Sequence, residues 1–588
     1  MNANRLGDRY LCRFLMVLTL PFSLVVLRGL SHANSSESAD SIFLNGNIYR
    51  GSVEDRKVPL AAAPVARAEA LAVKDGRFVA VGTNSEIRRW ATSKTRTIDL
   101  GGRFVMPGFN DAHLHLAQAG MQRLQVDLVG SASLGELKQR VADYCRRAAP
   151  RAWIQGGGWD QTLWARDILP TRADLDEVTT GHPAFLLRID AHIGLANSEA
   201  LRLGGIGPET PDPPGGHIDR DGKGEPTGIL REGAKQLVTA KIPKPTPLEL
   251  RRAIEAELED AARWGITSAQ DYSEWSAFLV YEDLLRENKL TLRISEWLPL
   301  NASLKDLEDW RAHHRKGDPY LKTTMLKGFM DGSLGSRTAA LFAPYSDDPG
   351  NSGLPQYEES HLRALSLERA AAGFQLGFHA IGDRGLQMAL DAFAAVKGSR
   401  QYQEDLRFRV EHAQVVAPEQ FATLRQLGVV ASVQPAFLLY DMKWGVARLG
   451  MERARHSYPW GELAANGIPL AFGTDAPVEV LNPFRGLYAA VTRQNEAGTA
   501  EYFPEQKVPI ELAISAYTFG SAWAELSENE KGRIEPGMLA DFVVLDRDIS
   551  TVPAQSLLKA RVLRTVVGGQ TVYLAADDMA SPNVPRSR

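Results

Sequence analysis

The pattern of hydrophobic and polar positions changes character twice along the chain, near residue 105 and again near residue 530. From about residue 41 to 104, short alternating runs such as EALAVKDGRFVAVG are separated by turn residues, and the Asp-Gly pair in that run predicts a β-hairpin. The segments GRIEPGMLADFVVLDRD and VLRTVVGGQTVYLA, within 530–575, have the same character. We therefore predict one small β-sandwich that is built from both ends of the chain, 41–104 and 530–575.

Between these two segments, buried apolar runs alternate with amphipathic helical stretches such as HLRALSLERAAAG. The predicted strands are the run that ends at His113 and the segments that begin near 266, 291, 323, 374, 406, 428 and 467. Strands and helices in this order predict an α/β fold, a (β/α)8 TIM-like barrel over residues 105–485. The stretch from about 119 to 244 is rich in Gly, Pro and Trp and fits no such unit, so we predict an insertion after the first strand. Residues 486–529 are predicted to form a helical C-terminal barrel segment, and residues 576–588 a tail.

The first 33 residues differ from the rest of the chain. Three arginines precede the apolar run Phe14–Leu27, and Ser31-His32-Ala33 offers small residues at the positions that a signal peptidase recognises. This pattern predicts a signal peptide over residues 1–33 and a secreted or periplasmic protein. An uncleaved anchor or a misassigned start is the alternative. Because the apolar run is shorter than the roughly 20 residues of a spanning helix, we expect no stable membrane span after signal removal.

Composition narrows the class of protein further. The 588 residues are 44% hydrophobic and 23% charged, which is typical of a soluble globular protein, and the formal net charge is −4. Residues 1–33 contain four arginines and one aspartate, so the net charge without them is −7, and no basic stripe suggests a nucleic-acid partner. Cys12 lies in the predicted signal, which leaves Cys145 alone and excludes an intramolecular disulfide or a cysteine zinc site in the mature chain.

The chemically informative residues stand at the ends of the predicted barrel strands. His113 and His115, in VMPGFNDAHLHL, alternate along a strand and therefore share one face, where two imidazoles can chelate a divalent cation. Four further polar residues end other strands: Lys327, His379, His412 and Asp475. Singly, each of them is more often a satisfied core residue. Together, at the end of the barrel where such enzymes keep their active sites, they predict a catalytic site for zinc or a similar ion.

Several motifs together resemble one enzyme family. They are PGFNDAHLHL, LKGFMDGSLGSRTAAL, GFHAIGDRG, RVEHAQ, FGTDAP and KGRIEPGMLADFVVLD. The chain resembles the amidohydrolase superfamily and, more narrowly, amidohydrolase family 3, which includes N-substituted formamide deformylase-like proteins. The resemblance extends from about Ser41 to Leu574.

The resemblance implies a site for one or two divalent ions, with zinc as the expected metal. His113, His115 and Asp475 would hold the first ion, and His379 and His412 the second.

Lys327 would bridge the two ions after reacting with carbon dioxide to form a carbamate. A buried ammonium group is costly, whereas a carbamate is an anionic bidentate ligand. The alternative is an unmodified Lys327 that pairs with Asp331 beside a single metal.

The implied reaction is hydrolysis of an amide by metal-activated water. Asp475 would act as general base and then as general acid towards the departing nitrogen. Glu411 would orient imidazole rings. Asn110 and Asp111 either shape the turn before the histidine pair or contact the metal.

The insertion is predicted to supply the substrate pocket. Trp159, in GGGWDQTLW, is a candidate substrate contact. His192, in LLRIDAHIGLAN, is either a catalytic and substrate-binding residue that stabilises the carbonyl oxygen or an ordinary buried histidine. Arg337, in GSLGSRTAAL, either binds an anionic substrate or holds its own loop in place.

The sequence thus predicts a metal-dependent hydrolase of a carbon–nitrogen bond other than a peptide bond. The favoured substrate, and the expected partner, is a small-molecule linear amide such as an N-substituted formamide. A cyclic amide of the hydantoin or imidazolone type is the alternative within the same chemistry. A non-catalytic binding or signalling relative and an esterase or phosphoesterase are alternatives of other classes, although no arginine cluster suggests phosphate. A homodimer is left open.

Overall fold

The computed structural model describes residues 38–51, 65–166, 168–314, 317–400 and 406–576. The predicted signal peptide and residues 577–588 of the predicted tail lie outside these ranges. Within them, no helix combines the length and the apolar character that crossing a membrane requires.

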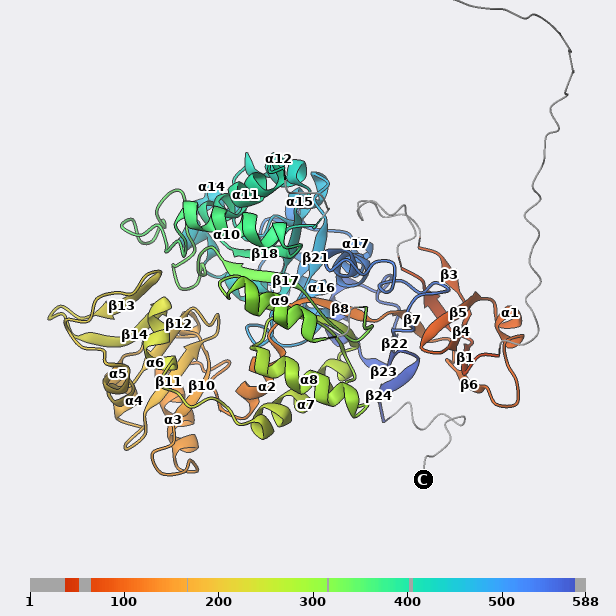
Figure 1. Ribbon diagram of the computed structural model, residues 1–588, viewed down its shortest axis with the longest axis horizontal. Helices are drawn as coiled ribbons and strands as arrows, with labels where there is room; N and C mark the ends of the chain where they lie inside the picture. Colours follow the sequence, from red (N-terminus) through yellow and green to blue (C-terminus); the bar gives the residue numbers. More distant parts are fainter. Residues whose placement is uncertain (1–37, 52–64, 167, 315–316, 401–405, 577–588) are drawn as a thin grey trace, which may run out of the picture. The chain divides into compact units, whose positions relative to one another are not determined.

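Eight parallel strands in sequence order form the barrel (Figure 1). The strands are β8 (Phe109–Leu114), β15 (Ile266–Asp271), β16 (Arg293–Pro299), β17 (Leu321–Phe329), β18 (Gln375–Ala380), β19 (Arg409–His412), β20 (Val430–Val433) and β21 (Leu470–Phe472). The first and last strands meet just beyond β21, where the Asp475 N–H donates to the His113 carbonyl oxygen at 2.6 Å and the Thr474 N–H donates to the Asp111 carboxylate at 3.0 Å. The predicted (β/α)8 barrel is confirmed.

Amphipathic helices cover the outside of the barrel. Those between successive strands include α7 (Pro247–Arg263), α8 (Trp275–Arg286), α9 (Leu304–His313), α10 (Glu359–Ala371), α11 (Asp383–Lys397), α12 (Gln420–Leu427), α13 (Leu438–Asp441), α14 (Gly445–Ala454) and α15 (Trp460–Ala465). After β21 come α16 (Pro483–Thr492), α17 (Ile510–Ser515) and α18 (Ser521–Ala524). Helix α7 begins with a capping box in which Thr246 and Glu249 satisfy each other's backbone N–H groups, and Pro247 stands at its first position. It packs on α2 (Leu116–Arg123) so closely that a Cβ at Gly120 would lie 2.1 Å from the Ala253 carbonyl oxygen.

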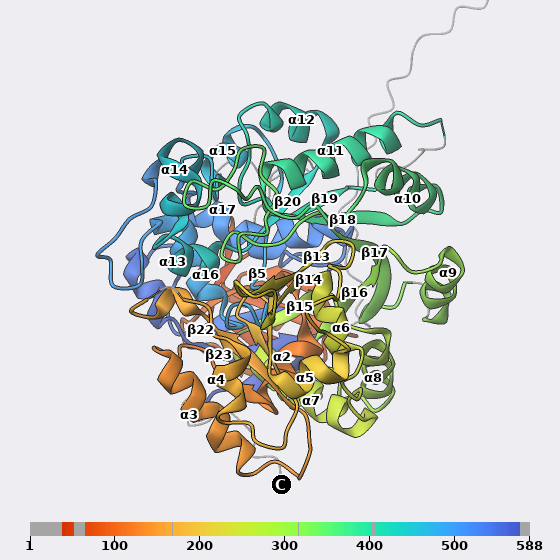
Figure 2. The same ribbon diagram turned by 90° about the vertical axis from the view of Figure 1, so that its left-hand side faces the viewer.

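The insertion between α2 and α7 forms a sheet of its own, in the order β13-β14-β12-β11-β10-β9. Its strands are β9 (Val126–Asp127), β10 (Ile154–Trp159), β11 (Ala184–Arg188), β12 (Ile193–Ala196), β13 (Gly216–Arg220) and β14 (Pro226–Glu232). Its helices are α3 (Leu134–Cys145), α4 (Arg172–Asp176), α5 (Ser198–Gly204) and α6 (Gln236–Thr239). Separate hydrophobic clusters pack on this sheet, and Figure 2 shows its helices in front of the barrel.

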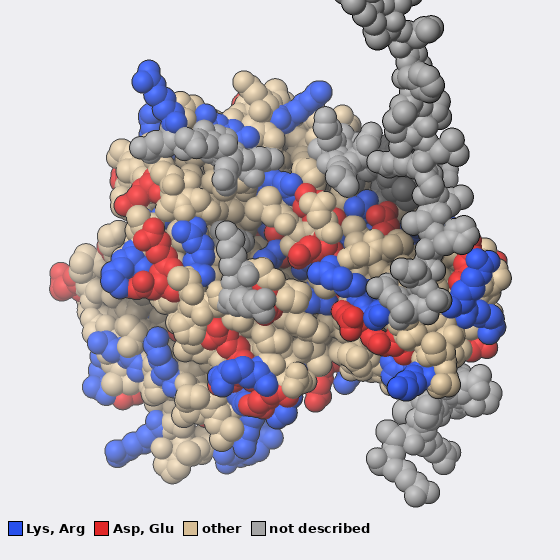
Figure 3. Space-filling model, turned by 45° about the vertical axis from the view of Figure 1, so that its right-hand side comes forward, with Lys and Arg blue, Asp and Glu red and all other residues tan. Residues whose placement is uncertain are grey.

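Two small sheets contain the segments before residue 108 and after residue 541. One has the order β5-β4-β1-β6, and the other the order β24-β23-β22-β7-β2-β3, so only the second joins strands from both ends of the chain. Their strands are β1 (Ser41–Leu44), β2 (Asn47–Tyr49), β3 (Arg67–Ala68), β4 (Ala70–Lys74), β5 (Arg77–Gly82), β6 (Arg96–Asp99), β7 (Phe104–Pro107), β22 (Phe542–Leu545), β23 (Val562–Val567) and β24 (Gln570–Leu574); α1 (Asn84–Arg88) follows β5. Phe43 and Phe542, one from each sheet, meet edge to face within a shared core, which confirms the predicted sandwich. On the face drawn in Figure 3, side chains of both charge signs are interspersed.

Candidate metal centre and substrate cavity

A cavity of about 2270 Å³ opens at the carboxyl end of the barrel strands, between the barrel and the insertion. Its lining includes the six residues predicted as metal ligands and the histidine predicted as catalytic: His113, His115, Lys327, His379, His412, Asp475 and His192. The structure therefore brings together residues that are separated by up to about 360 positions in the sequence.

The two histidines of β8 and its end are each held by one ring nitrogen. Nδ1 of His113 lies 2.9 Å from Oε2 of Glu411, at the end of β19. Nδ1 of His115 lies 2.9 Å from the backbone carbonyl oxygen of Tyr272. Because a carbonyl oxygen only accepts hydrogen bonds, Nδ1 carries the proton in the His115 ring, and Nε2 of the neutral ring keeps its lone pair. The His113 contact with Glu411 has the distance of an ion pair but not the geometry of a hydrogen bond.

The histidines that end β18 and β19 are held in the same way. Nε2 of His379 lies 3.1 Å from the Gly332 carbonyl oxygen, and Nδ1 of His412 lies 2.7 Å from Oε1 of Gln434. A fixed acceptor on one nitrogen of each ring is the arrangement that orients metal-binding imidazoles in proteins. Burial lowers the pKa of His113, His379 and His412 well below the ordinary value, which favours the neutral, metal-binding form.

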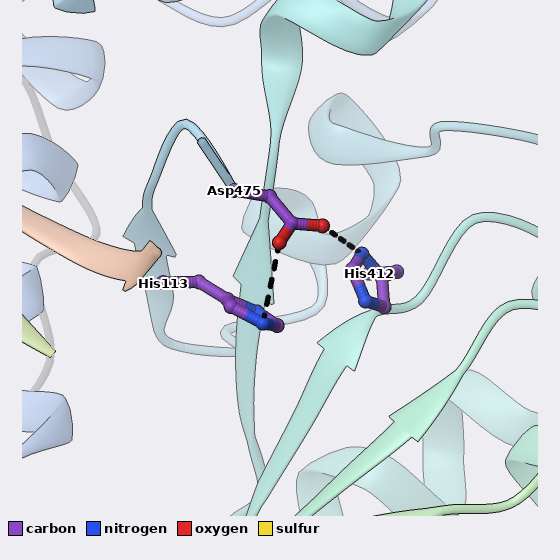
Figure 4. Close-up of side chains that lie close together, drawn as sticks. All are labelled: His113, His412 and Asp475. Atoms are coloured by element: carbon purple, nitrogen blue, oxygen red, sulfur yellow. Dashed lines mark ion pairs between the residues drawn. The ribbon is translucent and has the colours of Figure 1, made fainter. Parts of the chain in front are cut away.

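Asp475 follows the last barrel strand and faces the rings of His113 and His412 (Figure 4). Its Oδ1 lies 3.0 Å from Nε2 of His115 and 3.6 Å from Nε2 of His113, and its Oδ2 lies 4.0 Å from Nδ1 of His412. One ligand atom each from His113, His412 and Asp475 lie within 4.8 Å of one another. Burial opposes the charge of Asp475, but neighbouring cationic groups, Lys327 among them, lower its pKa, so the carboxylate is ionised.

These contacts leave one carboxylate oxygen of the site without a hydrogen bond among the described residues. The Asp475 Oδ1 atom is buried and, in the described part of the chain, makes no hydrogen bond of good geometry. In the neutral form of His115 that donates from Nδ1 to the carbonyl oxygen, a ring lone pair and a carboxylate oxygen face each other at 3.0 Å. Two such acceptors at this separation require a proton or a cation between them. The donor set, imidazole nitrogens and a carboxylate, fits a divalent metal such as zinc.

Lys327 enters the site from β17. Its Nζ donates to Nε2 of His113 at 2.8 Å and lies above the rings of Trp297 and Phe329. Burial lowers its pKa to about 8, so a substantial fraction of the neutral amine, the form that reacts with carbon dioxide, is present near neutral pH. The alternative of a Lys327–Asp331 pair is not what the structure shows. The Asp331 carboxylate instead accepts hydrogen bonds from the backbone N–H groups of Ala340, Ile381 and Gly382.

A buried ion pair supports the centre from inside the barrel. Arg409 and Glu411 are both fully buried, 2.8 Å apart, and Arg409 also donates to the Ala112 carbonyl oxygen and to Ser432. The charge of Glu411 is thus compensated while Oε2 remains beside His113. The Asp111 carboxylate accepts from Thr474 and from the His113 N–H, and Asn110 donates to Glu525, so these two residues shape the strand end.

The insertion forms the opposite wall of the cavity with charged side chains. Nδ1 of His192 lies 2.9 Å from Oε2 of Glu232, and its ring lies 5.1 Å from that of His379. Arg188 is held between Asp160 and Asp190, each at 2.6 Å. The contact between His192 and Glu232 raises the pKa of His192, although burial acts in the other direction.

The other two residues predicted to contact substrate lie elsewhere. The Trp159 indole is fully buried in the core of the inserted sheet, and its N–H donates to the Leu186 carbonyl oxygen at 3.2 Å. The Arg337 guanidinium binds the Asp347 carboxylate at 3.0 Å, which fits its alternative role of holding the loop.

Two contributors to the site were missed in the sequence. Gln434 directly follows β20, so the strand-end rule that selected the ligands could have found it. Glu232 ends a strand of the insertion, and no spacing in the sequence connects it with His192.

Comparisons with known proteins agree with this geometry. The amidohydrolase family matches residues 96–573. The chain is 34% identical over 555 residues to the protein LONG AFTER FAR-RED 3 of Arabidopsis thaliana, covering 91% of this chain and 92% of that one. It is 31% identical to the putative amidohydrolase YtcJ of Bacillus subtilis, covering 86% and 96% of the two chains, and 31% identical to the N-substituted formamide deformylase of Arthrobacter pascens, covering 86% and 95%.

Solved structures give the same result. An uncharacterised metal-dependent hydrolase of Pyrococcus horikoshii superposes with a TM-score of 0.70 at 30% identity, covering 87% of this chain and 99% of the other. One of Pyrococcus furiosus superposes with a TM-score of 0.67 at 32% identity, covering 87% and 100%. The chain belongs to the amidohydrolase family, in the branch called family 3, and has the fold of its metal-dependent hydrolases.

Proposed function

We propose that this protein is a metal-dependent amidohydrolase that cleaves a linear amide, such as an N-substituted formamide, at a carbon–nitrogen bond other than a peptide bond. The relative from Arthrobacter pascens, whose name states that activity, supports the substrate class. The observation that carries the proposal is the cluster of His113, His412 and Asp475, whose ligand atoms lie within 4.8 Å of one another. Beside it, His115 Nε2 and Asp475 Oδ1 lie 3.0 Å apart, a pair that either a proton or a bound cation would hold together.

The chemistry divides between the metal and the chain. A bound divalent ion, for which we propose zinc, lowers the pKa of water and polarises a carbonyl group. Asp475, which is ionised, accepts the proton of the attacking water and passes it to the departing nitrogen. His192 hydrogen-bonds the substrate carbonyl oxygen. A carbon–oxygen bond forms, the carbon–nitrogen bond breaks, and the products are a carboxylic acid and an amine.

The ligand roles that we propose are those that the resemblance to amidohydrolase family 3 implies. We propose that His113, His115 and Asp475 hold one ion and that His379 and His412 hold a second. Lys327, as a carbamate, would bridge them. Its low pKa and its place beside His113 support this role.

Metal content per chain tests the proposal most directly. The protein is purified without chelator and analysed for its elements. About two equivalents of zinc or a similar ion per chain support the bridged centre. About one equivalent would mean that Lys327 does not bridge two ions. No metal, even after reconstitution with zinc and bicarbonate, would contradict the hydrolase and favour a non-catalytic relative.

A substrate screen then separates the amide classes. Metal-loaded protein is incubated with 4-nitroformanilide as a linear amide and with hydantoin as a cyclic one. Release of 4-nitroaniline supports the proposal, whereas turnover of hydantoin alone would move the function to cyclic amides.

We also propose that the protein is exported, on the basis of the basic start and apolar run of residues 1–33. N-terminal sequencing of the protein from its native cells tests this proposal. A mature chain that begins near Asn34 is expected, and an intact Met1 would contradict cleavage.

A further inference from the structure

The pair His192 and Glu232 belongs to the insertion and yet faces the metal centre. His192 precedes β12, and Glu232 ends the neighbouring strand β14. Nδ1 of the imidazole lies 2.9 Å and 3.0 Å from the two carboxylate oxygens. The ring centroid lies 5.1 Å from that of His379, so the insertion places a polar side chain against the barrel's own cluster.

This contact determines which atom of His192 faces the cavity. Because a carboxylate only accepts hydrogen bonds, Nδ1 carries the proton that it donates to Glu232. Nε2 lies on the other side of the ring, and the His192 side chain keeps 14% of its surface exposed, on the lining of the cavity. Among the described residues, no group hydrogen-bonds this Nε2 atom, so it remains available to a ligand.

Glu232 is itself held from several directions. Its backbone N–H donates to the His192 carbonyl oxygen at 3.0 Å, and its φ of +46° is unusual for a residue with a side chain. A Cβ on Gly332 would lie 2.3 Å from Oε1 of Glu232, so the loop backbone approaches this carboxylate closely. The carbonyl oxygen of Gly332 is the one that holds His379. Gly332 of the barrel loop thus lies against the Glu232 carboxylate and also holds His379, a proposed metal ligand.

A second carboxylate fastens the same part of the insertion to the barrel. Asp190 accepts the His192 N–H at 3.2 Å and the Ser336 hydroxyl at 2.6 Å, and it also accepts the Ser333 hydroxyl. Both serines lie in the loop that follows β17, the strand of Lys327. The backbone of His192 is therefore anchored independently of its ring. A loss of Glu232 would release the ring and leave the backbone of His192 in place.

We infer that Glu232 is a positioning residue: it orients the His192 ring so that Nε2 hydrogen-bonds the reacting group of the substrate from the His379 side of the centre. Asp475 acts from the His115 side. This inference rests on the proposed function. It makes the insertion a part of the reacting machinery in addition to a wall of the cavity.

A double-mutant cycle tests the inference. Glu232→Leu, His192→Ala and the double variant are compared with the wild type in kcat and KM for 4-nitroformanilide. We expect Glu232→Leu to lower kcat by about 10- to 100-fold, the usual cost of losing such a partner, with unchanged metal content. In the His192→Ala background the same change should alter kcat by less than about twofold, because Glu232 acts through His192. Equal losses in both backgrounds would overturn the inference, because Glu232 would then act on the fold alone.

Two further variants separate orientation from folding. Glu232→Gln keeps an acceptor oxygen and should retain more activity than Glu232→Leu. If it does not, hydrogen bonding is not what Glu232 contributes. Asp219→Asn is the matched control, because Asp219 lies on the hairpin partner of β14 and pairs with Arg231 at 2.7 Å outside the cavity lining. It should leave kcat and KM unchanged.

The cycle also works if the amide is not turned over. In that case the proposed function fails for this substrate, and the same four proteins, loaded with zinc, are titrated with acetohydroxamic acid by calorimetry. This small carbonyl compound binds metal centres and presents an oxygen to His192. The inference is supported if Glu232→Leu weakens binding in the wild-type background but has no effect on binding in the His192→Ala background. Equal affinity in all four proteins overturns it.

Discussion

The two walls of the cavity are both rich in polar side chains, but their hydrogen bonds are satisfied to different extents. On the barrel wall, His115, His379 and His412 each have one nitrogen fixed by an acceptor, whereas the Asp475 Oδ1 and His113 Nδ1 atoms lack a hydrogen bond among the described residues. On the insertion wall, the Arg188 guanidinium donates hydrogen bonds to Asp160, Asp190 and Gln161 at 2.6–2.9 Å. Unsatisfied acceptors indicate a place for a cation, and saturated pairs indicate a rigid surface. Only the barrel wall is therefore expected to depend on metal.

Replacement of Asp475 by asparagine gives the largest expected effect. The variant loses the proton acceptor and a charged ligand, so we expect kcat on an amide substrate to fall by about 10²- to 10⁴-fold while the protein remains folded. The measurement is steady-state kinetics together with circular dichroism. Asp219→Asn is the control, because it makes the same substitution at an aspartate of the insertion that does not line the cavity. Retained turnover in the Asp475 variant would disprove its role as proton carrier.

Replacement of Lys327 by alanine tests the bridge on the same wall. We expect a lower metal content per chain and a loss of activity of at least about 10-fold, with partial rescue by acetate or propionate, whose carboxylates can replace the carbamate. Elemental analysis and kinetics with and without the acids measure both effects. Unchanged metal content and activity would show that no carbamate bridge exists.

Replacement of Arg188 by methionine tests the opposite wall. Asp160 and Asp190 would be left buried without their partner, which typically costs about 3–5 kcal/mol of stability, while metal content stays unchanged. Urea unfolding and elemental analysis of the purified variant separate the two effects. A loss of metal in this variant would remove the distinction between the walls.

The same contrast explains how far the sequence alone could lead. The barrel ligands were predictable because parallel strands bring their carboxyl ends to one rim, so that position along each strand determines position in space. In the insertion this logic fails. The pairing of β10 with β11 shifts register between Gly157 and Trp159, which breaks the alternation and turns the Trp159 indole into the core. Arg337 has a φ of +55°, a left-handed turn conformation that the pattern of apolar residues does not predict. Its side chain donates a hydrogen bond to Asp347. Glu232 lies beside His192 because β14 pairs with β12 in the inserted sheet. The local pattern of apolar and polar residues does not predict which strands pair.

The smallest expected effect concerns Asp441, which ends α13 and faces the charged residues of the insertion wall. Burial raises its pKa to about 8, and Asp160 and Asp190 act in the same direction against Arg188. In the unfolded chain the carboxyl ionises near pH 4, so between about pH 4 and pH 8 the folded state binds one proton more. The contribution of Asp441 to stability is therefore largest below about pH 4 and falls as the pH rises towards 8. Asp441→Asn lacks this titration and should gain about 1 kcal/mol relative to the wild type between about pH 5 and pH 8, since partial exposure screens the full shift. Urea unfolding of both proteins across this range measures the difference. Parallel curves would mean that Asp441 is ionised in the folded protein, so that the insertion wall presents an unbalanced negative charge to the substrate.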